Sequence, residues 1–486
     1  MSKKILVLGS GFSSLAASCY LAQMGLDVHI YEKNKTIGGR ARQLKREGFT
    51  FDIGPTWYWM PDVFERFFAD FNKTPEDYYT LNKLSPAYRV FFGKNEYITI
   101  EDTLEKIKSA FEKEESGSSI KLQKFIDEAK DNYDVAIKDL VYRPGVSPLE
   151  LVTPVTIKKL GSFFSTIQKE VRKSFKNKKL VQILEFPVLF LGAKPSNTPA
   201  FYSFMNYADF GIGTFHPKTG MYAVIKAIEN LAIELGVTIH TSQEVGRIRT
   251  KDSHAIGIEV DGKTIEGDII LSGADYHHTE TLLPEALRQY SEEYWESRTF
   301  APSSLLFYVG FDKKIENVDH HTLFFDVDFD KHAQEIYDEP EWPEDPLFYA
   351  SFPSKTDSSV APENNEAGIF LIPLAPGLYD TAEMRDHYFD LIMDRFESLT
   401  GQQAKKNIIF KESFCVNDFV QDYHSYKGNA YGMANTLLQT AFLRPKLKSK
   451  KVKNLYFTGQ LSVPGPGVPP SLISGKLAAG LIAKQQ

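Results

Sequence analysis

Cysteine is almost missing from this chain of 486 residues, which contains only Cys19 and Cys415. Two cysteines cannot build the disulfide framework typical of small secreted proteins, and so low a number favours a reducing compartment. Long apolar runs are missing too, since no stretch approaches the roughly 18 consecutive apolar residues of a membrane-spanning helix. The apolar run 5–8 is too short for the core of a signal peptide. We therefore expect a cytoplasmic protein without a transmembrane segment.

An excess of positive charge is also missing. Lysine and arginine number 56 and aspartate and glutamate 63, which gives a net charge of −7 at pH 7. Because nucleic-acid-binding proteins concentrate positive charge, this balance argues against nucleic acid as a partner. Hydrophobic residues make up 42% of the chain and charged residues 24%, as in globular proteins. At about 150 residues per domain, the length predicts two or three domains.

The first 32 residues predict a strand, a glycine turn, a helix and a second strand. The apolar run 5–8 is too short for a helix and fits a buried parallel strand. A helix is predicted from about Phe12 to Met24, and Gly25 is its expected stop. The second strand covers residues 28–31 and ends at Glu32.

Residues 9–14 match the dinucleotide-binding pattern G-x-G-x-x-G, except that Ser14 stands at the last position. Gly9 makes the tight turn, Gly11 lets the backbone approach a pyrophosphate, and Ser14 is small enough for helix–strand packing. The helix start offers N–H groups and a positive dipole end to phosphates. Glu32 stands where a carboxylate binds a ribose diol and disfavours the extra phosphate of NADP. The alternative is an ordinary glycine turn, and the motif alone leaves NAD and FAD open.

A second glycine block helps to choose between these cofactors. Residues 38–40, Gly-Gly-Arg, follow Glu32 closely, and residues 51–56 lie a little beyond. Paired glycines let the backbone approach a ligand, and arginine can hold a phosphate or a flavin edge by a forked contact. The alternative for Arg40 is a surface loop with a salt bridge.

A third block lies near the C-terminus. A predicted strand at 455–460 ends in Gly459-Gln460 and precedes a Gly/Pro loop at 463–471. A helix is predicted at 472–483, and its N-terminus is a second dipole site for a ligand.

Together these blocks resemble the FAD-dependent amine-oxidase and carotenoid-desaturase superfamily, and within it the bacterial-type phytoene (carotenoid) desaturases. The resemblance covers nearly the whole chain, and residues 273–280 further resemble the hydroxycarotenoid 3,4-desaturase branch. The stretches that carry the resemblance are 38–42, 51–61, 215–246, 273–283, 428–445 and 456–480.

The resemblance implies an α/β fold with a discontinuous Rossmann-like FAD-binding domain and a substrate domain. The FAD-binding domain would combine residues 1–80, 216–295 and 445–486, because the phosphate motif and the flavin-ring loop must contact one ligand. Residues 81–215 and 296–444 would form the substrate domain, with an antiparallel sheet and a mainly helical lid at 101–205.

The resemblance also implies cofactor-binding residues in all three segments. The first glycine motif and the carboxylate after the second strand would hold the pyrophosphate and the adenosine ribose. Gln460 departs from the family pattern, in which an acid or a small residue is commoner. The expected FAD-binding residues are Gly9, Gly11, Ser13, Ser14, Glu32, Lys33, Gly39, Arg40, Thr56, Trp57, Val245, Gly459, Gln460, Gly467 and Val468.

The implied activity removes two hydrogens from an acyclic, hydroxylated carotenoid by hydride transfer to the flavin. Because the developing positive charge delocalises into the polyene, this reaction needs positioning and an apolar site more than strong acids and bases. No catalytic base can be named: Asp209 is a conceivable base, but the interpretation as a solvated surface acid is equally good. Either oxygen or a quinone would reoxidise the flavin.

Two alternatives stay open: a flavin-dependent carotenoid isomerase and a non-enzymatic escort for isoprenoid chains. The intact residues 38–40 and the C-terminal loop favour flavin binding over escort. No metal site is expected. His277 and His278 are predicted in a strand, where neighbouring side chains point to opposite faces, and His320 and His321 are interpreted in the same way.

The rest of the chain predicts a charged helical region at 101–185 and strands at 238–240, 255–260 and 265–271. The acidic, proline-rich stretch 340–366 is expected to be a surface excursion.

Residues 156–180 predict a membrane contact. They contain eight basic residues and only one acid, with Leu160, Phe163, Phe164, Ile167 and Val171 at helical spacing. An apolar face flanked by cations suits a helix lying on an anionic bilayer. We therefore expect peripheral attachment to the cytoplasmic membrane, and the alternative is a surface helix packed on its own domain.

Overall fold

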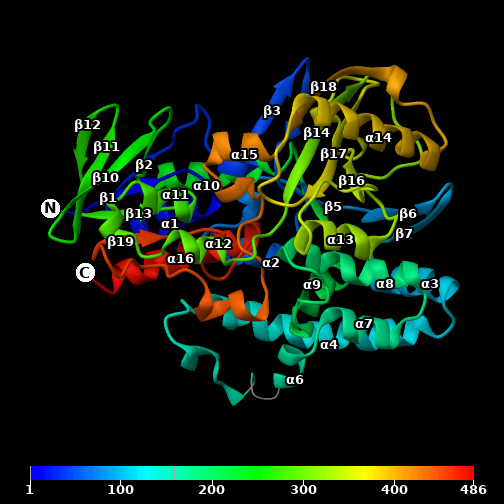
Figure 1. Ribbon diagram of the computed structural model, residues 1–486, viewed down its shortest axis with the longest axis horizontal. Helices are drawn as coiled ribbons and strands as arrows, with labels where there is room; N and C mark the ends of the chain where they lie inside the picture. The colour runs from blue at the N-terminus through cyan, green and yellow to red at the C-terminus, as the bar shows by residue number, and fades with distance from the viewer. Residues whose placement is uncertain (1, 155, 157–158, 486) are drawn as a thin grey trace.

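The computed structural model describes residues 2–154, 156 and 159–485. Figure 1 shows two sheet-containing lobes side by side, with a layer of helices below them. The N- and C-termini lie close together at the outer edge of one lobe. Within the described residues, no helix combines the length and the apolar character needed to cross a bilayer.

A five-stranded parallel sheet forms the centre of the lobe that holds the termini. Its order in space is β19, β13, β1, β2, β9, and Leu6 of β1 pairs with Ile270 on one side and His29 on the other. Residues 5–8 are at most 2% exposed, which explains their uninterrupted apolar character. The strands are β1 (Lys4–Leu8), β2 (Asp27–Tyr31), β9 (Thr238–His240), β13 (Ile269–Ser272) and β19 (Leu455–Phe457).

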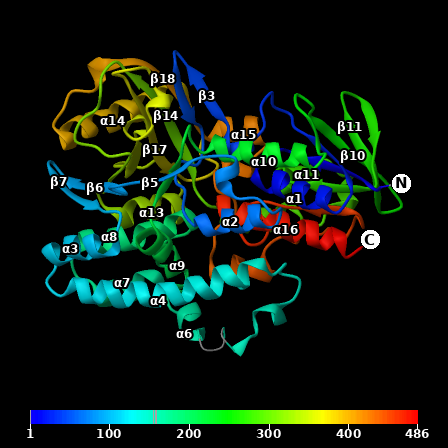
Figure 2. The ribbon, with the colours of Figure 1, turned by 180° about the vertical axis from the view of Figure 1, so that it is seen from behind.

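Three helices pack beside this sheet. α1 (Phe12–Gln23) contacts both α10 (Tyr222–Glu234) and α16 (Val468–Ala483), and Figure 2 shows all three from behind. The crossing of α1 and α16 is very close, because a Cβ on Gly475 would lie 2.5 Å from the Ser13 carbonyl oxygen. The absence of a side chain at Gly475 therefore lets α16 pack directly against the α1 backbone.

Residues 265–271, expected as one strand, form two strands in different sheets. The antiparallel sheet of β10 (Val245–Lys251), β11 (His254–Val260) and β12 (Lys263–Glu266) ends before Gly267, and β13 then joins the parallel sheet. A Cβ on Gly267 would lie 2.6 Å from the Leu6 side chain, so the chain turns where no side chain fits.

The second lobe contains a seven-stranded sheet in the order β18, β14, β17, β16, β15, β6, β7. All neighbours are antiparallel except β15 and β6, and α14 (Ala382–Thr400) packs against the sheet. The strands are β6 (Tyr88–Gly93), β7 (Glu96–Ile100), β14 (Ser303–Phe311), β15 (His321–Phe324), β16 (Phe348–Ser351), β17 (Glu366–Leu374) and β18 (Ile408–Phe414).

The prediction of a surface excursion at 340–366 is wrong for the middle of that stretch. β16 pairs with both β15 and β17, and all four of its residues are buried. β16 has only four residues, so it hardly changes the acidic, proline-rich composition of the stretch. Composition therefore could not reveal this strand.

The helical layer confirms the predicted helical region, but residues 156–180 do not form one exposed amphipathic helix. Ile167 and Val171 have 0% exposure, so the apolar side of α7 packs on its own domain. Lys158 and the side chain of Leu160 lie outside the described residues. The helices are α3 (Leu104–Glu114), α4 (Ser118–Lys138), α6 (Leu160–Phe164), α7 (Ile167–Ser174), α8 (Lys178–Glu185) and α9 (Phe204–Asn206).

Short elements connect these layers. His277 and His278 lie in a helix and not in the predicted strand, because the Asp275 side chain caps the helix by accepting from the His278 amide. The short elements are β3 (Gln43–Arg46), β4 (Phe49–Asp52), α2 (Pro61–Ala69), β5 (Leu81–Lys83), β8 (Phe215–Pro217), α11 (Tyr276–Thr281), α12 (Glu292–Glu296), α13 (Phe329–Tyr337) and α15 (Val416–Tyr423). The predicted α/β class with a second, largely antiparallel sheet is confirmed.

The close helix crossing yields a stability prediction. Gly475→Ala should lower the thermal unfolding midpoint, since the added methyl group must push α16 away from the α1 backbone at a cost of about 2 kcal/mol. Gly480→Ala is the matched control in the same helix, because nothing lies within 4 Å of its added Cβ. The control should be neutral or stabilising by up to about 1 kcal/mol. Equal midpoints for the two variants would show that the crossing is not tight.

Candidate functional site

One large cavity lies between the carboxyl ends of the parallel strands, the seven-stranded sheet and the helical layer. Its volume is about 870 Å³, within the usual range for ligand sites. The loops after β1 and β19 line one end, and apolar side chains such as Phe163 and Phe201 line the other. The crevice outside the carboxyl ends of parallel strands is where open α/β sheets bind ligands.

The glycine turn after β1 brings bare backbone to the cavity wall. Gly9 has a φ of +82°, and Gly39 lies so close that its Cβ would stand 3.3 Å from the Gly11 Cα. α1 begins at Gly11 without a side-chain cap, so its first amides remain available to a ligand. Ser13 lines the cavity, whereas Ser14 is buried behind the turn, where a Cβ on Gly273 would overlap its hydroxyl.

Glu32 is buried beside this turn and lines the cavity. Its carboxylate accepts hydrogen bonds from the Ser10 amide at 3.0 Å and the Ser10 hydroxyl at 2.6 Å. It also accepts from the Asn34 amide at 2.8 Å and the Asn34 side chain at 2.9 Å. Glu32 therefore fixes the glycine turn against the end of β2 and places negative charge at this end of the cavity.

Lys33 joins a polar cluster over the same end. Its ammonium donates to the Gln421 carbonyl at 2.6 Å and lies 3.2 Å from His424 Nε2, which is 2.8 Å from a Glu244 oxygen. The His278 ring stacks on His424 with 3.9 Å between ring centroids, and burial lowers the pKa of His278 to about 4. Val245 lines the cavity next to Glu244. These contacts connect both lobes across the cavity mouth.

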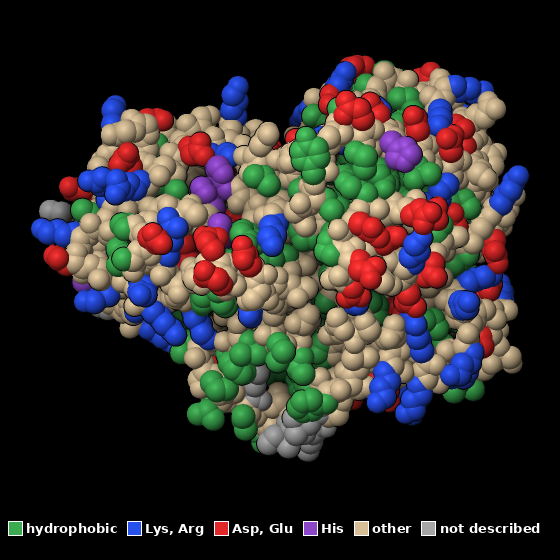
Figure 3. All heavy atoms as spheres, viewed as in Figure 1, with side chains coloured by type: hydrophobic (Ala, Val, Ile, Leu, Met, Phe, Trp, Pro, Cys, Tyr) green, Lys and Arg blue, Asp and Glu red, His purple; other side chains and the backbone are tan. Residues whose placement is uncertain are grey.

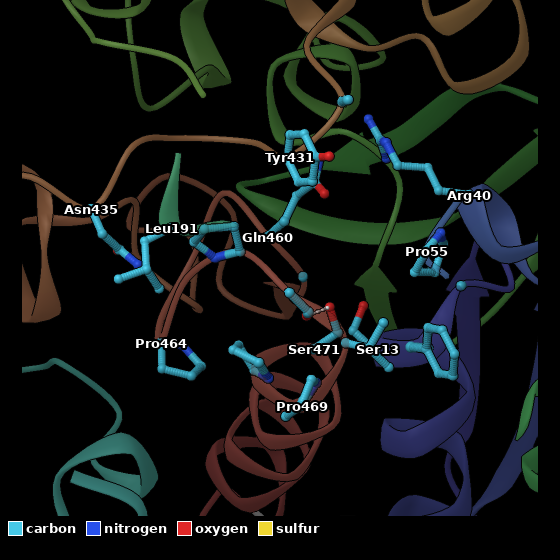
Figure 4. A pocket seen from close by; sticks show the side chains of 18 of the residues that line it. Ser13, Arg40, Pro55, Leu191, Tyr431, Asn435, Gln460, Pro464, Pro469 and Ser471 are labelled. Atoms are coloured by element: carbon cyan, nitrogen blue, oxygen red, sulfur yellow. Dashed lines mark hydrogen bonds between the residues drawn. The ribbon is translucent and has the colours of Figure 1, made fainter. Parts of the chain in front are cut away.

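A second helix N-terminus lines the same end of the cavity. α16 begins after Gly467, which has no side-chain cap, and the next residues are Val468, Pro469 and Pro470. Because proline carries no N–H, the Val468 amide is the free donor that this first turn can offer. Figure 4 shows Ser471 of α16 beside Ser13 of α1, with Pro469 below them. Residues from the two ends of the chain thus line one space.

Arg40 and Gln460 face this space from opposite sides in Figure 4. Arg40 Nη2 donates to the Ser425 hydroxyl at 2.9 Å, while its buried Nε has no hydrogen-bond partner among the described residues. Gln460 packs against Gly432, where a Cβ would stand 2.8 Å from the Gln460 Cγ. Gly459, Thr56 and Trp57 line the same region.

Arg444 was not among the residues predicted from the sequence. It lies behind the C-terminal loop and is 1% exposed. It donates to the carbonyls of Met433 at 2.8 Å and Gln460 at 3.2 Å, and to the Asn435 side chain at 2.5 Å. Burial lowers the pKa of Arg444 to about 10. Nothing in the local sequence signals that this arginine is buried.

The other end of the cavity is apolar and opens among exposed apolar side chains. Val152, Phe164, Leu437 and Leu443 line the cavity and are also at least 40% exposed. Figure 3 shows hydrophobic side chains gathered at the lower edge of the molecule, below the helical layer. A long apolar ligand can therefore enter from this side.

The interpretation of Asp209 as a solvated surface acid is wrong. Asp209 is 2% exposed and accepts a hydrogen bond from the Tyr88 hydroxyl at 2.7 Å. Burial raises the pKa of Asp209 to about 7, and the hydroxyl groups of Tyr88 and Thr214 only partly offset it. It lies in the stretch 207–212, whose irregular helix turns the carboxylate inward. Among the described residues, no group of three or more His, Cys, Asp or Glu side chains is arranged to hold a metal ion.

Comparisons with known proteins agree with this geometry. A family model described as flavin containing amine oxidoreductase matches residues 12–483. A carotenoid 3,4-desaturase of Haloarcula japonica is 41% identical and covers 98% of this chain and 97% of its own. A zeta-carotene-forming phytoene desaturase of Myxococcus xanthus is 30% identical, and the match covers 98% of this chain and 93% of its own.

Solved structures show the same fold at low identity. An oxidoreductase from Methanosarcina mazei has a TM-score of 0.65 at 16% identity and covers 97% of this chain and 99% of its own. A putrescine oxidase variant has a TM-score of 0.64 at 12% identity, and the match covers 100% of this chain and 99% of its own.

The fold and the cavity are therefore those of a flavin-dependent oxidoreductase. The chain belongs to the flavin-containing amine oxidoreductase family, in the branch that contains the carotenoid desaturases. The predicted family is confirmed. The cavity fits a flavin on its own features, because two uncapped helix starts, a cradle of bare glycines and an unpartnered Arg40 nitrogen meet in one space.

The buried Asp209 yields a prediction of pH dependence. A folded-state pKa raised from 3.8 to about 7 means that the neutral carboxyl is favoured in the fold. Its contribution to stability is complete below about pH 4 and is lost as the pH rises through about 7. Asp209→Asn should therefore reduce the fall in thermal midpoint between about pH 5 and pH 8. Asp62→Asn is the control, since exposed Asp62 also accepts from a tyrosine hydroxyl, that of Tyr133. A pH profile of Asp209→Asn as steep as that of the wild type would contradict this assignment.

Proposed function

We propose that this chain is an FAD-dependent carotenoid desaturase, which removes two hydrogens from an acyclic, hydroxylated carotenoid and extends its conjugated polyene. The observation that carries the proposal is the continuity of the cavity. Two helix N-termini lie at one end of it, and apolar walls lead from there to an apolar opening. The names of the relatives from Haloarcula japonica and Myxococcus xanthus support the same activity.

FAD is proposed over a shorter flavin because the polar end of the cavity continues past the glycine turn. Glu32, Lys33 and Val245 line that continuation, where an adenosine would lie. The FAD-binding domain would comprise residues 1–80, 216–295 and 445–486, and the substrate domain residues 81–215 and 296–444 with the lid at 101–205. The proposed FAD contacts are Gly9, Gly11, Ser13, Glu32, Lys33, Gly39, Arg40, Thr56, Trp57, Val245, Gly459, Gln460, Gly467 and Val468. Ser14 would act only by packing behind the turn.

The chain's own groups would position the substrate and exclude water. Bound flavin supplies a two-electron acceptor for the hydride. The α16 N-terminus and the buried Arg444 place positive potential beside the C-terminal loop, which favours an electron-rich ligand there. Trp57 and Phe186, whose ring centroids lie 5.9 Å apart, belong to the apolar walls that would hold the polyene in line.

Two alternatives to a desaturase are a carotenoid isomerase and a non-enzymatic isoprenoid escort. A carotenoid isomerase needs the same cavity without net oxidation. An escort is a reasonable alternative on fold alone, because a RAB GDI from Plasmodium falciparum has a TM-score of 0.56 at 10% identity. The glycine cradle favours a flavoprotein, since a lipid escort needs no such close approach of backbone to a ligand.

Anaerobic mixing of the flavin-loaded protein with acyclic carotenoids, hydroxylated and not, tests the proposal. A desaturase bleaches the flavin and shifts the polyene absorbance to longer wavelength, and hydroxylated substrates should react faster. An isomerase changes the polyene without bleaching, and an escort does neither. Either of these outcomes would overturn the proposal. Adding oxygen or a quinone to the bleached enzyme identifies the acceptor that restores the flavin.

The proposed FAD contacts yield a retention prediction. Glu32→Gln and Arg40→Met should each purify with less than half of the wild-type flavin, because each loses charge-assisted hydrogen bonds of about 1.5–3 kcal/mol. The matched controls are Glu47→Gln and Arg46→Met on the exposed β3–β4 turn. The flavin released by heat is quantified and identified by chromatography. Full occupancy in both site variants, or release of a flavin other than FAD, would contradict these assignments.

We also propose that the protein attaches to a membrane surface through an apolar tip, which replaces α7 as the contact. The tip is the set of exposed apolar side chains around the cavity opening. It consists of Val146, Leu149, Val152, Phe164, Leu437, Leu438 and Leu443, which are 40–76% exposed. Because several of these residues also line the cavity, a carotenoid could pass from a bilayer into the cavity without crossing water.

The tip yields a vesicle-binding prediction. Leu149→Asp combined with Phe164→Asp should lose at least about tenfold in binding to neutral and anionic vesicles, because two apolar side chains of about 1.5 kcal/mol each can no longer insert. Changing the exposed residues Lys169, Lys173 and Lys176 to Glu should remove only the preference for anionic vesicles. Co-sedimentation measures both variants. Wild-type binding by the tip variant would contradict the proposal.

A further inference from the structure

Three buried histidines lie next to the cavity wall and have no role in the proposed FAD site. His216, His320 and His321 are at most 3% exposed. The ring centroids of His321 and His320 are 4.4 Å apart, and those of His320 and His216 are 4.6 Å apart. Three imidazoles in contact form a row, and the described residues do not arrange it as a metal site.

The row begins at the cavity. His321 Nδ1 lies 2.6 Å from the hydroxyl of Tyr349, and this hydroxyl is 2.9 Å from the Thr56 hydroxyl. Tyr349 and Thr56 both line the large cavity. Trp57 stacks on the His321 ring at 4.0 Å between centroids. Tyr349 is therefore a wall residue of the cavity whose hydroxyl contacts both Thr56 and the first histidine of the row.

The row ends at the surface. His320 Nδ1 lies 2.6 Å from the hydroxyl of Thr356, which is an exposed residue. A second, small pocket contacts this part of the row and is lined by Thr56, His216, His320 and Ser351 among others. It has room for about one water molecule.

The unpartnered atoms along the row are polar and buried. His321 Nε2 and the Ser351 hydroxyl have no hydrogen-bond partner among the described residues, and His216 Nε2 lies 3.6 Å from an Asp357 oxygen. Ser351 stands opposite His321 in the β15–β16 register and also lines the small pocket. A bridging water or a ring rotation can connect such atoms, as proton transfer along a row of imidazoles requires.

We propose that Tyr349 accepts the proton released during desaturation and that His321 and His320 pass it to Thr356 and solvent. This inference rests on the proposed desaturase function and supplies the base that the sequence does not reveal. A bound oxidised flavin would supply the acceptor for one hydrogen and its electron pair, taken from one C–H bond. The neighbouring C–H bond loses a proton, and its electron pair becomes the second bond of the new C=C.

The Tyr349 oxygen takes this proton while its own proton passes to His321 Nδ1. His321 then releases the proton on Nε2 toward His320, and reorientation of the hydroxyl and the ring resets the pair. Because the allylic cation left after hydride loss is very acidic, a neutral hydroxyl backed by imidazole is a sufficient base.

The charges around the row suit this role. Burial lowers the pKa values of His320 and His321 well below 6.5 and raises that of Tyr349, so all three are neutral at rest. Two carboxylates face His216. Asp357 lies 3.6 Å from it, and hydrogen bonds from His216, Ser359 and Thr219 lower the Asp357 pKa although burial opposes them. Asp52, beyond it, has its pKa raised to about 6 by burial. A transient positive charge on the row is thus stabilised away from the substrate.

The first test uses the protein itself and no substrate. In protein labelled with ¹⁵N-histidine, the imidazole resonances should show His321 as the neutral Nε2–H tautomer, with Nδ1 accepting a hydrogen bond from about pH 6 to pH 8. Tyr349→Phe should move the Nδ1 resonance to the position of a free acceptor. A His321 with its proton on Nδ1 would overturn the proposed direction of transfer.

The second test measures anaerobic flavin reduction by the carotenoid. Tyr349→Phe and His321→Asn should each slow it by roughly 10²-fold, with flavin content and thermal midpoint preserved. The double variant should be no slower than the slower single variant, because the pair acts as one unit. Tyr58→Phe is the control, since it removes a buried hydroxyl that contacts Tyr79 outside the cavity.

The outcomes separate this inference from the proposed function. Bleaching by the wild type that is equally fast in Tyr349→Phe and Tyr58→Phe would overturn the proton path and leave the desaturase intact. Additive slowing in the double variant would also overturn it, because independent structural damage adds. A wild-type protein that no carotenoid bleaches would overturn the function and the path together.

Discussion

The close crossing of α1 and α16 is the constraint on which the rest of the structure depends. Gly475 lets α16 approach the α1 backbone at Ser13 and Ala17, where a Cβ would lie within 3 Å of both residues. β1 and β19 join the same parallel sheet through β13, so the loops that follow them open into one space. Two helix N-termini, encoded at opposite ends of the chain, thereby line one cavity.

The cavity built on this crossing separates two chemistries along its length. Glu32, Lys33 and Glu244 give one end a network of charged hydrogen bonds, whereas the far end leads through aromatic walls to the exposed apolar tip. Between them, Tyr349 brings one hydroxyl to the wall, with three buried histidines behind it. Under the proposed function, the ligand charge, the apolar chain and the released proton would each take a separate route.

The sequence could predict the parts of this design that depend on local pattern. The apolar run 5–8 predicts the central strand because a strand covered on both faces needs no polar alternation. Predictions from local pattern were wrong where contacts with residues distant in sequence determine the structure. β16 is a strand because β15 and β17 flank it, α7 is inward-facing because its domain covers Ile167, and Asp209 is buried because Tyr88 reaches it from another strand. The histidine row could not be predicted for the same reason, since His216 and Tyr349 lie far from His320 and His321 in sequence.

The most direct test of the account is a crystal structure of the FAD-loaded protein with a bound carotenoid. We expect one FAD to contact both the turn at Gly11 and the start of α16 at Val468, with its adenosine beside Glu32. The polyene should run from the flavin ring past Tyr349 to the tip. An FAD that contacts only one of the two helix starts, or a carotenoid bound outside the cavity, would contradict the central claim that both chain ends build one site.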